Sequence, residues 1–379
     1  MIFNGLVALG NDFSLKSPIL LYLRHHFLIT MKRVRRILRW VGIVTVVLCI
    51  AYLLGPRPES PKFDKTLPEI NFAPAELDAF IAKSESEWPV RLDNEARIVW
   101  ADSLNKQQTD YAIVYLHGFS ASQEEGDPVH TTIAKTFGCN LYLSRLSMHG
   151  LDTSEQLLGL TADNYWESAK QALAIGKQLG KNVILMGTST GGTQALQLAA
   201  AFPDVVQGLV LLSPNVAIKD PNAWLLNNPW GLQIARMVKG GDYVVAKDTR
   251  PIYKSYWNTP YRLEAVVQLQ EMLESSMKAA TFQKITQPML LMYYFKDDNN
   301  QDQVVSVAAM RKMFEQVATP HTLKKEVALP NTGDHVIGSY IKSGDVQSVI
   351  DVSAEFLEEV MKLKKKDSPI VVNDSTGKG

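Results

Sequence analysis

A short segment around Ser189 carries the residue types of a nucleophilic serine. An apolar run at 183–186 precedes Gly187-Thr188-Ser189-Thr190-Gly191, and a helix-forming run at 194–201 follows it. Strand, Gly-x-Ser-x-Gly and helix form a nucleophile elbow, in which small residues let the strand and the helix approach a strained turn. The serine hydroxyl then lies at a helix N-terminus, which stabilises developing negative charge. A plain Gly/Ser loop capping a helix has the same pattern, so this interpretation depends on partners for Ser189 elsewhere.

The general-base candidate is His335, in the stretch 331–336 (NTGDHV) after the expected last strand at 326–329. A histidine in this place can accept the serine proton and later deliver it to a leaving group. His321 precedes that strand, at the wrong end of the expected sheet, and is disfavoured as the base. Asp334 is interpreted as a loop or capping residue.

Three aspartates compete to be the acid that orients this histidine. All follow the expected strand at 289–295, so they lie between the serine and the histidine, in the order Ser, acid, His. Asp302 opens the stretch 302–306 (DQVVS) directly before a predicted helix, where the acid loop usually ends. Asp297 and Asp298 are nearer the strand end. We favour Asp302, and the assignment among the three stays open at this point.

A loop after another apolar strand supplies the expected oxyanion hole. The strand at 111–116 (YAIVYL) ends in His117-Gly118-Phe119-Ser120. The backbone N–H groups of Phe119 and of Thr190, the residue after the nucleophile, are the expected donors. Fixed backbone donors need no reorganisation when the tetrahedral oxyanion forms. We interpret His117 as a residue that orients this loop.

Alternating strands and helices must position these residues. The order predicts an α/β fold with a mostly parallel central sheet and helices on both faces. The helix before the elbow strand lies within 160–179, with Thr161 as its N-cap. The expected strands are 96–101, 111–116, 140–143, 183–186, 208–213, 289–295 and 326–329.

The stretch Pro214–Gln287 is too long for a simple crossover and is rich in aromatic residues. We therefore expect a small cap inserted at about 215–287, which would cover the active site, bury an apolar acyl group and exclude water. Many of its aromatic side chains are also expected to fill the cap's own core.

From about Ala96 to Lys365 the chain resembles the α/β-hydrolase superfamily. The motifs HGF, RLSMHG, GTSTGG, DQVVS and GDH are similar to those of the bacterial carboxylesterase and monoacylglycerol-lipase branch and its serine-aminopeptidase-type relatives. This resemblance implies hydrolysis of an acyl ester or a monoglyceride-like ester without a cofactor. Two features depart from the pattern: the acid loop is longer than usual, and the elbow differs from the GGSWG of proline iminopeptidases, which makes peptidase activity less expected.

Composition excludes few function classes. The 379 residues can bury one large α/β core or two modest domains. The 39 Lys and Arg residues balance the 39 Asp and Glu residues, so bulk charge gives no indication of nucleic-acid binding.

The segment 31–55 is typical of a membrane-targeting sequence. A basic cluster precedes Trp40–Leu54, a stretch without a charged residue. We predict a transmembrane signal anchor whose basic end stays in the cytoplasm, which places the rest of the chain on the extracytoplasmic, or periplasmic, side. A cleaved signal peptide is the alternative, although residues 51–54 offer no good cleavage site.

The remaining boundaries follow from composition. Residues 1–30 have no clear pattern and are interpreted as a non-native or disordered extension, with the true start at Met31. Residues 56–73 form a Pro-rich linker, 74–366 the hydrolase domain, and 367–379 a disordered tail.

Together, these motifs predict a serine-dependent carboxylic-ester hydrolase that forms an acyl-enzyme on Ser189. Small-molecule acyl esters and the membrane are the expected partners. An acyltransferase or an aminopeptidase could use the same triad, and a non-catalytic, membrane-anchored binding module is the alternative from another class.

Overall fold

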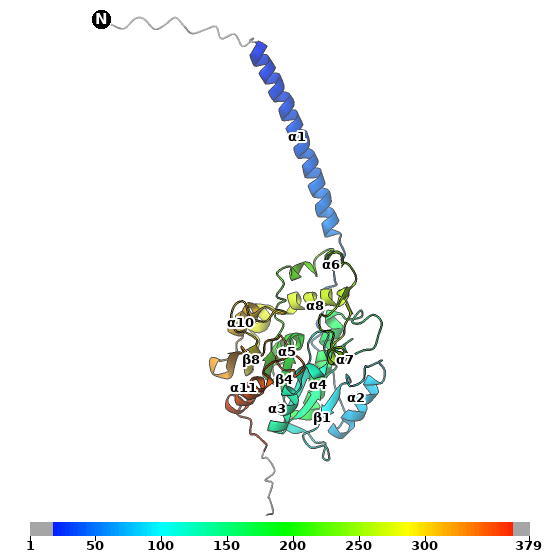
Figure 1. Ribbon diagram of the computed structural model, residues 1–379, viewed down its shortest axis with the longest axis vertical. Helices are drawn as coiled ribbons and strands as arrows, with labels where there is room; N and C mark the ends of the chain where they lie inside the picture. The colour runs from blue at the N-terminus through cyan, green and yellow to red at the C-terminus, as the bar shows by residue number, and fades with distance from the viewer. Residues whose placement is uncertain (1–17, 367–379) are drawn as a thin grey trace, which may run out of the picture. The chain divides into compact units, whose positions relative to one another are not determined.

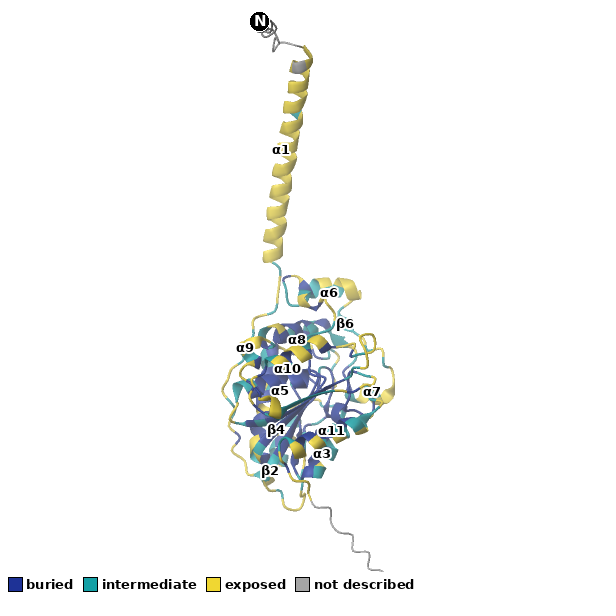
Figure 2. Ribbon diagram, turned by 90° about the vertical axis from the view of Figure 1, so that its left-hand side faces the viewer, coloured by how far each residue is buried: buried dark blue, intermediate teal, exposed yellow. Residues whose placement is uncertain are grey.

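The structure, a computed structural model, describes residues 18–366, and its contacts divide the chain into one unit up to Pro56 and another from Arg57. The first unit contains the helix α1 (Pro18–Leu53), whose side chains are almost all exposed (Figure 2). Within it, Leu21–Leu53 is long and apolar enough to cross a membrane. The helix begins well before Met31, so residues 18–30 are helical. The predicted extension before residue 18 and the predicted tail 367–379 lie outside the described residues.

A seven-stranded sheet forms the centre of the second unit (Figure 1). The strand order is β1-β3-β2-β4-β5-β8-β9, and every neighbouring pair is parallel except β1 with β3. The predicted mostly parallel sheet is therefore confirmed. The strands are β1 (Arg97–Val99), β2 (Thr109–Leu116), β3 (Asn140–Leu143), β4 (Gly180–Thr188), β5 (Val206–Leu212), β8 (Met289–Tyr293) and β9 (Lys324–Ala328).

Helices cover both faces of the sheet because strand side chains alternate between two apolar clusters. In β2, Ala112 and Val114 belong to the cluster of α4 and α5, whereas Ile113 and Tyr115 belong to the cluster of α3 and α11. Thr161 caps α4 by accepting the Asn164 amide, as predicted. The helices around the sheet are η1 (Pro74–Glu76), α2 (Leu77–Glu85), η2 (Gln123–Gly126), α3 (Val129–Phe137), α4 (Ala162–Leu179), α5 (Thr190–Ala201), α10 (Val307–Gln316), η4 (His321–Leu323) and α11 (Val346–Glu359).

The segment between β5 and β8 has two parts. Its elements are η3 (Ala223–Leu225), α6 (Gly231–Lys239), β6 (Tyr243–Val244), α7 (Pro251–Tyr256), β7 (Tyr261–Arg262), α8 (Leu263–Ser276) and α9 (Ala279–Phe282). The part up to β7 contains short helices and a two-stranded sheet. In contrast, α8 packs into the core of the main sheet through Ala265, Leu269 and Met272. The predicted cap segment 215–287 thus includes a helix, α8, that packs into the main core.

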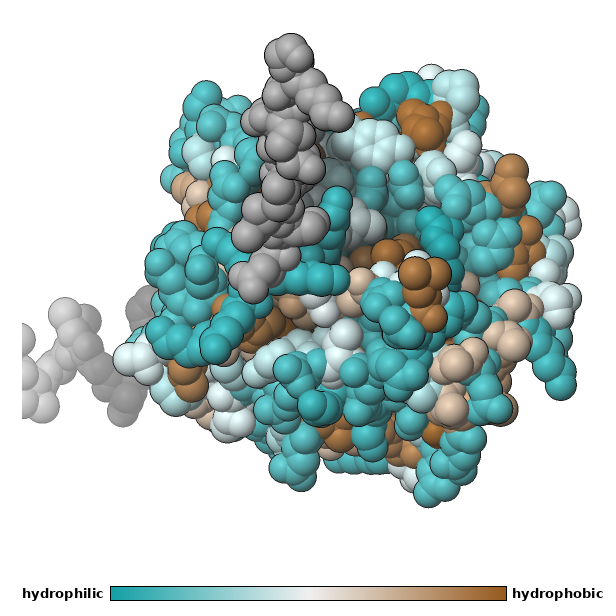
Figure 3. All heavy atoms as spheres, turned by 90° about the horizontal axis from the view of Figure 1, so that it is seen from below, coloured by the Kyte–Doolittle hydropathy of each residue, from teal (hydrophilic) through white to brown (hydrophobic). Residues whose placement is uncertain are grey.

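Part of the predicted linker is fixed to the second unit. The amides of Lys62 and Phe63 both donate to Asp163. Lys170, whose side chain is almost fully buried, pairs with Asp64 at 2.9 Å. Residues 62–64 of the predicted linker are therefore bonded to α4. The face of the second unit in Figure 3 is predominantly hydrophilic, with small hydrophobic patches.

Candidate active site

The backbone at Ser189 has the strained geometry of a nucleophile elbow. Its φ of 52° and ψ of −117° lie in a region that L-residues rarely adopt. Three hydrogen bonds maintain this turn. The Ser189 amide donates to Leu212 at 2.9 Å, and the Ser189 carbonyl accepts from the amides of Asn215 at 2.8 Å and Thr193 at 3.2 Å. β4 and β5 thus fix the turn that presents Ser189 at the start of α5.

Glycine is required beside this turn because the strand and helix backbones are in close contact. A Cβ at Gly191 would lie 1.9 Å from the carbonyl oxygen of Leu116 in β2. A Cβ at Gly187 would lie 2.5 Å from the Gly191 carbonyl oxygen. Both distances are far below van der Waals contact, which accounts for the Gly-x-Ser-x-Gly spacing.

The structure brings His335 and Asp302 together from two different loops. The Nδ1–H group of His335 donates to Asp302 Oδ2 at 2.6 Å. Asp302 is fully buried, and its other carboxylate oxygen accepts the amides of Val304 at 2.8 Å and Val305 at 3.0 Å. This bonding fixes the tautomer in which His335 Nε2 is free to accept a proton.

The other acidic and histidine candidates lie elsewhere. Asp297 and Asp298 are exposed, and the Asp297 carboxylate accepts the amides of its own turn. Asp334 accepts the Val336 amide and pairs with Lys342 at 3.1 Å, as a loop residue would. His321 is exposed in η4, before β9.

Burial and charge act in opposite directions on the pair. Burial alone raises the pKa of Asp302, but the adjacent His335 and the hydrogen bonds to the carboxylate outweigh it and leave the pKa lowered. Burial alone lowers the pKa of His335, and the negative charge of Asp302 outweighs that effect and leaves the pKa raised. His335 Nε2 is buried and makes no hydrogen bond within residues 18–366, so no hydrogen bond joins it to Ser189 in this structure.

One cavity of about 510 Å³ contains Ser189 and His335 in its lining. The proposed oxyanion donors Phe119 and Thr190 line it as well. Within residues 18–366, neither of their amides donates to a backbone carbonyl in a turn, loop or cap. Three aromatic side chains from the segment between β5 and β8 also line the cavity. They are Tyr253, Trp257 and Tyr261.

His117 fixes the loop that carries the Phe119 amide. Its Nε2 accepts the Leu146 amide at 3.0 Å, so Nδ1 carries the proton and donates to the Gly118 carbonyl at 2.9 Å. Burial lowers the pKa of His117 to about 4, and the ring therefore stays neutral. This geometry agrees with the predicted orienting interpretation of His117.

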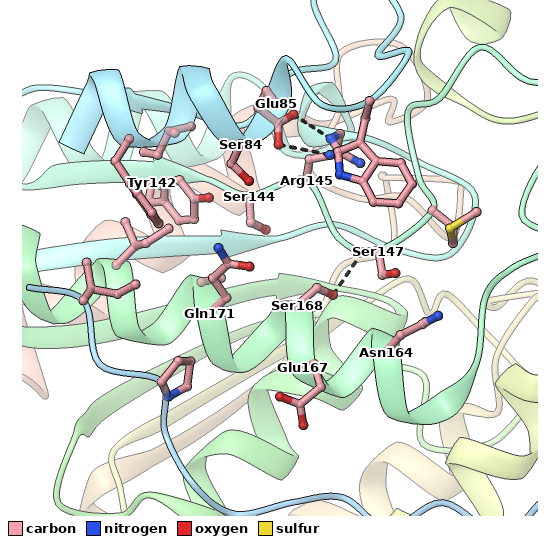
Figure 4. Close-up of a pocket in the computed structure, with 18 residues that line it drawn as sticks. Ser84, Glu85, Tyr142, Ser144, Arg145, Ser147, Asn164, Glu167, Ser168 and Gln171 are labelled. Carbon is pink, nitrogen blue, oxygen red and sulfur yellow. Dashed lines mark hydrogen bonds and ion pairs between the residues drawn. The ribbon is translucent and has the colours of Figure 1, made fainter.

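A second cavity lies between α2 and α4 (Figure 4). Arg145 there forms a bidentate ion pair with Glu85, in which Nε donates to Oε2 at 2.5 Å and Nη2 donates to Oε1 at 3.1 Å. Both side chains are largely buried. His149 Nδ1–H donates to the Ser147 carbonyl at 2.7 Å, and the ring stacks on Tyr165. The His149 ring also contacts His117 and Phe119, so it packs beneath the loop of the proposed oxyanion donor, whereas Arg145 pairs with Glu85.

Sequence reasoning missed Glu125, a buried carboxyl in the wall of the Ser189 cavity. It occurs in the polar stretch 122–127 (SQEEGD), where nothing in the pattern distinguishes it from Glu124. Within residues 18–366, no group of three or more His, Cys, Asp or Glu side chains is arranged to hold a metal ion.

Comparison with known proteins identifies the family. Residues 95–297 match the family described as the alpha/beta hydrolase fold, and the chain belongs to it. No curated protein matches the chain in sequence.

Solved structures share the fold at low identity. One belongs to the metagenome-derived lipolytic enzymes LipS and LipT, with 16% identity and a TM-score of 0.56 over 71% of this chain and 99% of that one. BpoC of Mycobacterium tuberculosis H37Rv is 11% identical, with a TM-score of 0.50 over 72% of this chain and 97% of that one. The monoacylglycerol lipase of Paleococcus ferrophilus is 14% identical, with a TM-score of 0.47 over 68% and 98%.

Proposed function

We propose that this protein is a serine hydrolase that cleaves carboxylic esters, with Ser189 as nucleophile, His335 as general base and Asp302 as the acid that orients it. The observation that carries the proposal is the 2.6 Å bond from His335, which lines the same cavity as the strained Ser189, to the buried Asp302. A serine, a histidine and a carboxylate in this chain order are the constellation of this fold's hydrolases.

The first half of the reaction acylates the serine. His335 Nε2 takes the proton of Ser189 as the hydroxyl oxygen attacks the ester carbonyl carbon. Asp302 stabilises the resulting imidazolium through the hydrogen bond at Nδ1. The amides of Phe119 and Thr190 donate to the oxyanion of the tetrahedral intermediate. The intermediate collapses when His335 gives its proton to the departing alcohol.

The second half releases the acid. A water molecule, deprotonated by the same His335 nitrogen, attacks the acyl carbon on Ser189. The oxyanion forms again between the same two amides. Its collapse expels the serine oxygen, which recovers its proton from His335, and the carboxylic acid leaves.

The cavity favours esters with an apolar acyl group. Tyr253, Trp257 and Tyr261 supply apolar ring surface, and a volume of about 510 Å³ accommodates a substrate of moderate size. An acyl ester or a monoglyceride-like ester is therefore the proposed substrate class, as in the branch that the sequence motifs resemble.

The decisive experiment compares the wild type with Ser189→Ala on p-nitrophenyl esters of increasing chain length. We expect the variant to lose turnover and to melt at the wild-type temperature. A fluorophosphonate probe should label the folded wild type at Ser189 and neither the variant nor heat-denatured protein. Folded wild-type protein without labelling or turnover would favour the non-catalytic binding module.

Measuring the reaction products distinguishes the three activities that the same triad could support. Transfer of the acyl group to an added alcohol in preference to water identifies an acyltransferase. Release of p-nitroaniline from aminoacyl anilides, faster than ester turnover, identifies an aminopeptidase. Release of free acid from esters identifies the proposed hydrolase.

We also propose that α1 anchors the protein as an uncleaved signal anchor, with the basic N-terminal side in the cytoplasm and the hydrolase domain on the other side of the membrane. Its length, its apolar composition and the basic cluster Lys32–Arg39 support this proposal. A cleaved signal sequence is the competing interpretation.

A further inference from the structure

Glu125 is a buried acidic group in the active-site cavity that the proposed triad does not use. It lies in the short helix η2 and has 2% of its surface exposed. Its side chain lines the cavity together with Ser189 and His335. Carboxyl groups are rarely buried to this extent without a specific partner, so its contacts indicate its role.

The partner of Glu125 is the backbone of the oxyanion loop. Glu125 Oε2 accepts the Gly118 amide at 2.5 Å. The Gly118 carbonyl in turn accepts from His117 Nδ1 and from the Ala121 amide. That carbonyl belongs to the same planar peptide unit as the Phe119 amide, so holding it sets the direction of the Phe119 N–H. Glu125 and His117 thus hold two successive peptide units, the second of which carries the proposed oxyanion donor.

The carboxyl group of Glu125 is also close to the nucleophile. A methyl group placed on Gly118 would meet Glu125 Oε1 at 2.7 Å and Ser189 Cβ at 3.1 Å. The carboxyl and the serine side chain therefore flank one methyl-sized position. A negative charge on Glu125 would act directly on the oxyanion that forms at Ser189, and repel it.

The surroundings of Glu125 determine whether it is charged. Burial raises the pKa of Glu125 to about 8, and the hydrogen bond from the Gly118 amide, the nearby His335 and the Tyr115 hydroxyl oppose this only in part. His335 is the basic group that lowers this pKa most, and Lys247 and Lys342 also line the cavity. The titratable groups that face Glu125 are Tyr115 of β2, Tyr165 of α4, Tyr253 of α7, and Asp334 and His335 of the loop after β9.

We infer that Glu125 is a positioning residue of the proposed hydrolysis: in its uncharged form it holds the Gly118 peptide, and through it the Phe119 amide, without placing a negative charge beside the oxyanion. The inference rests on the proposed function. It predicts that ionisation of Glu125 slows the acylation of Ser189, so that kcat falls as the pH rises beyond about 8.

Two substitutions test the two parts of this inference. Glu125→Gln keeps an acceptor for the Gly118 amide and cannot ionise. We expect it to retain kcat near neutral pH and to lose the decline of kcat above pH 8. Glu125→Leu removes the acceptor, and we expect kcat to fall by roughly 10- to 100-fold, with KM changed much less, because the Phe119 donor is misplaced. Glu124→Gln is the matched control, since Glu124 pairs with Tyr340 instead, and its pH profile should follow the wild type.

The measurement is kcat and KM on a short-chain p-nitrophenyl ester from pH 6 to 10, with the uncatalysed rate subtracted. The inference is overturned if Glu125→Gln declines above pH 8 as the wild type does, if it is inactive at neutral pH, or if folded Glu125→Leu keeps the wild-type kcat. If Glu125→Leu does not melt cooperatively, the pH profile of Glu125→Gln alone decides.

Failure of this inference is distinguishable from failure of the proposed function. Wild-type activity that persists in Ser189→Ala defeats the proposed function. Activity that depends on Ser189 but not on Glu125 defeats only the role of Glu125.

Discussion

Asp302 and Asp297 lie in the same loop, but Asp302 is buried and Asp297 is exposed. Asp302 bonds His335, whereas Asp297 bonds only amides of its own turn. We expect Asp302→Asn to lower kcat on the order of 10³- to 10⁴-fold, because the amide no longer fixes the imidazole tautomer or stabilises the imidazolium.

The matched control is Asp297→Asn, which should leave turnover essentially unchanged. Steady-state kinetics of both purified variants checks the assignment. A severe loss in Asp297→Asn with near-normal activity in Asp302→Asn would reassign the acid.

His335 sets the acidic limb of the pH profile. Because Asp302 keeps the pKa of His335 raised above its ordinary value, the imidazole becomes neutral, and able to accept the serine proton, only at higher pH. We expect kcat/KM to rise with pH through an apparent pKa above that of free histidine, near 6.5.

In Asp302→Asn, the negative charge is lost, so the remaining activity should rise at a lower pH than in the wild type. The comparison requires only initial rates across the acidic range. An acidic limb that stays at the same pH in both proteins would contradict the charge coupling.

At the scale of single elements, the junction of β4 and α5 is the least tolerant place in the fold. A side chain at Gly191 would collide with the Leu116 carbonyl of β2. We expect Gly191→Ala to destabilise the protein by about 3 kcal/mol or more and to distort the turn at Ser189.

Gly241 provides the control, since a Cβ there meets nothing within 4 Å. Gly241→Ala should therefore melt within a few degrees of the wild type. Thermal unfolding followed by circular dichroism measures both variants. An unchanged melting temperature in Gly191→Ala would contradict the close approach of α5 to β2.

Local pattern predicted most of these elements because each buried strand is a short apolar run bounded by turn residues. The runs at 111–116 and 183–186 fall within β2 and β4.

The part of the site that sequence could not reveal consists of tertiary contacts. Asp302 was favoured from its place before a helix, and its bond to His335 depends on how two loops meet. Glu125 has no periodic or motif signal, because its role comes from burial against Gly118. Similarly, a Pro-rich composition predicted a spacer, whereas Asp64 fixes that segment to Lys170 through a contact between distant residues.

At the scale of the whole molecule, the proposed anchor α1 would determine on which side of the membrane the hydrolase domain lies. If it is an uncleaved anchor, the full-length protein should stay in the membrane pellet after alkaline carbonate extraction and be released by detergent. Intact mass of the membrane-derived protein should include the residues of α1. Soluble protein that begins after residue 55 would instead establish a cleaved signal sequence.

The residues of the proposed site follow strands that are far apart in the sequence and are therefore synthesised at different times. β4 carries Ser189, but Asp302 follows β8, and His335 appears only after β9, near the end of the chain. During the synthesis of the 146 residues from 190 to 335 (335 − 189), the nascent polypeptide therefore contains the proposed nucleophile without its proposed base. If the proposed anchor α1 exports the chain during synthesis, the proposed triad is completed only once β9 has joined the sheet on the far side of the membrane.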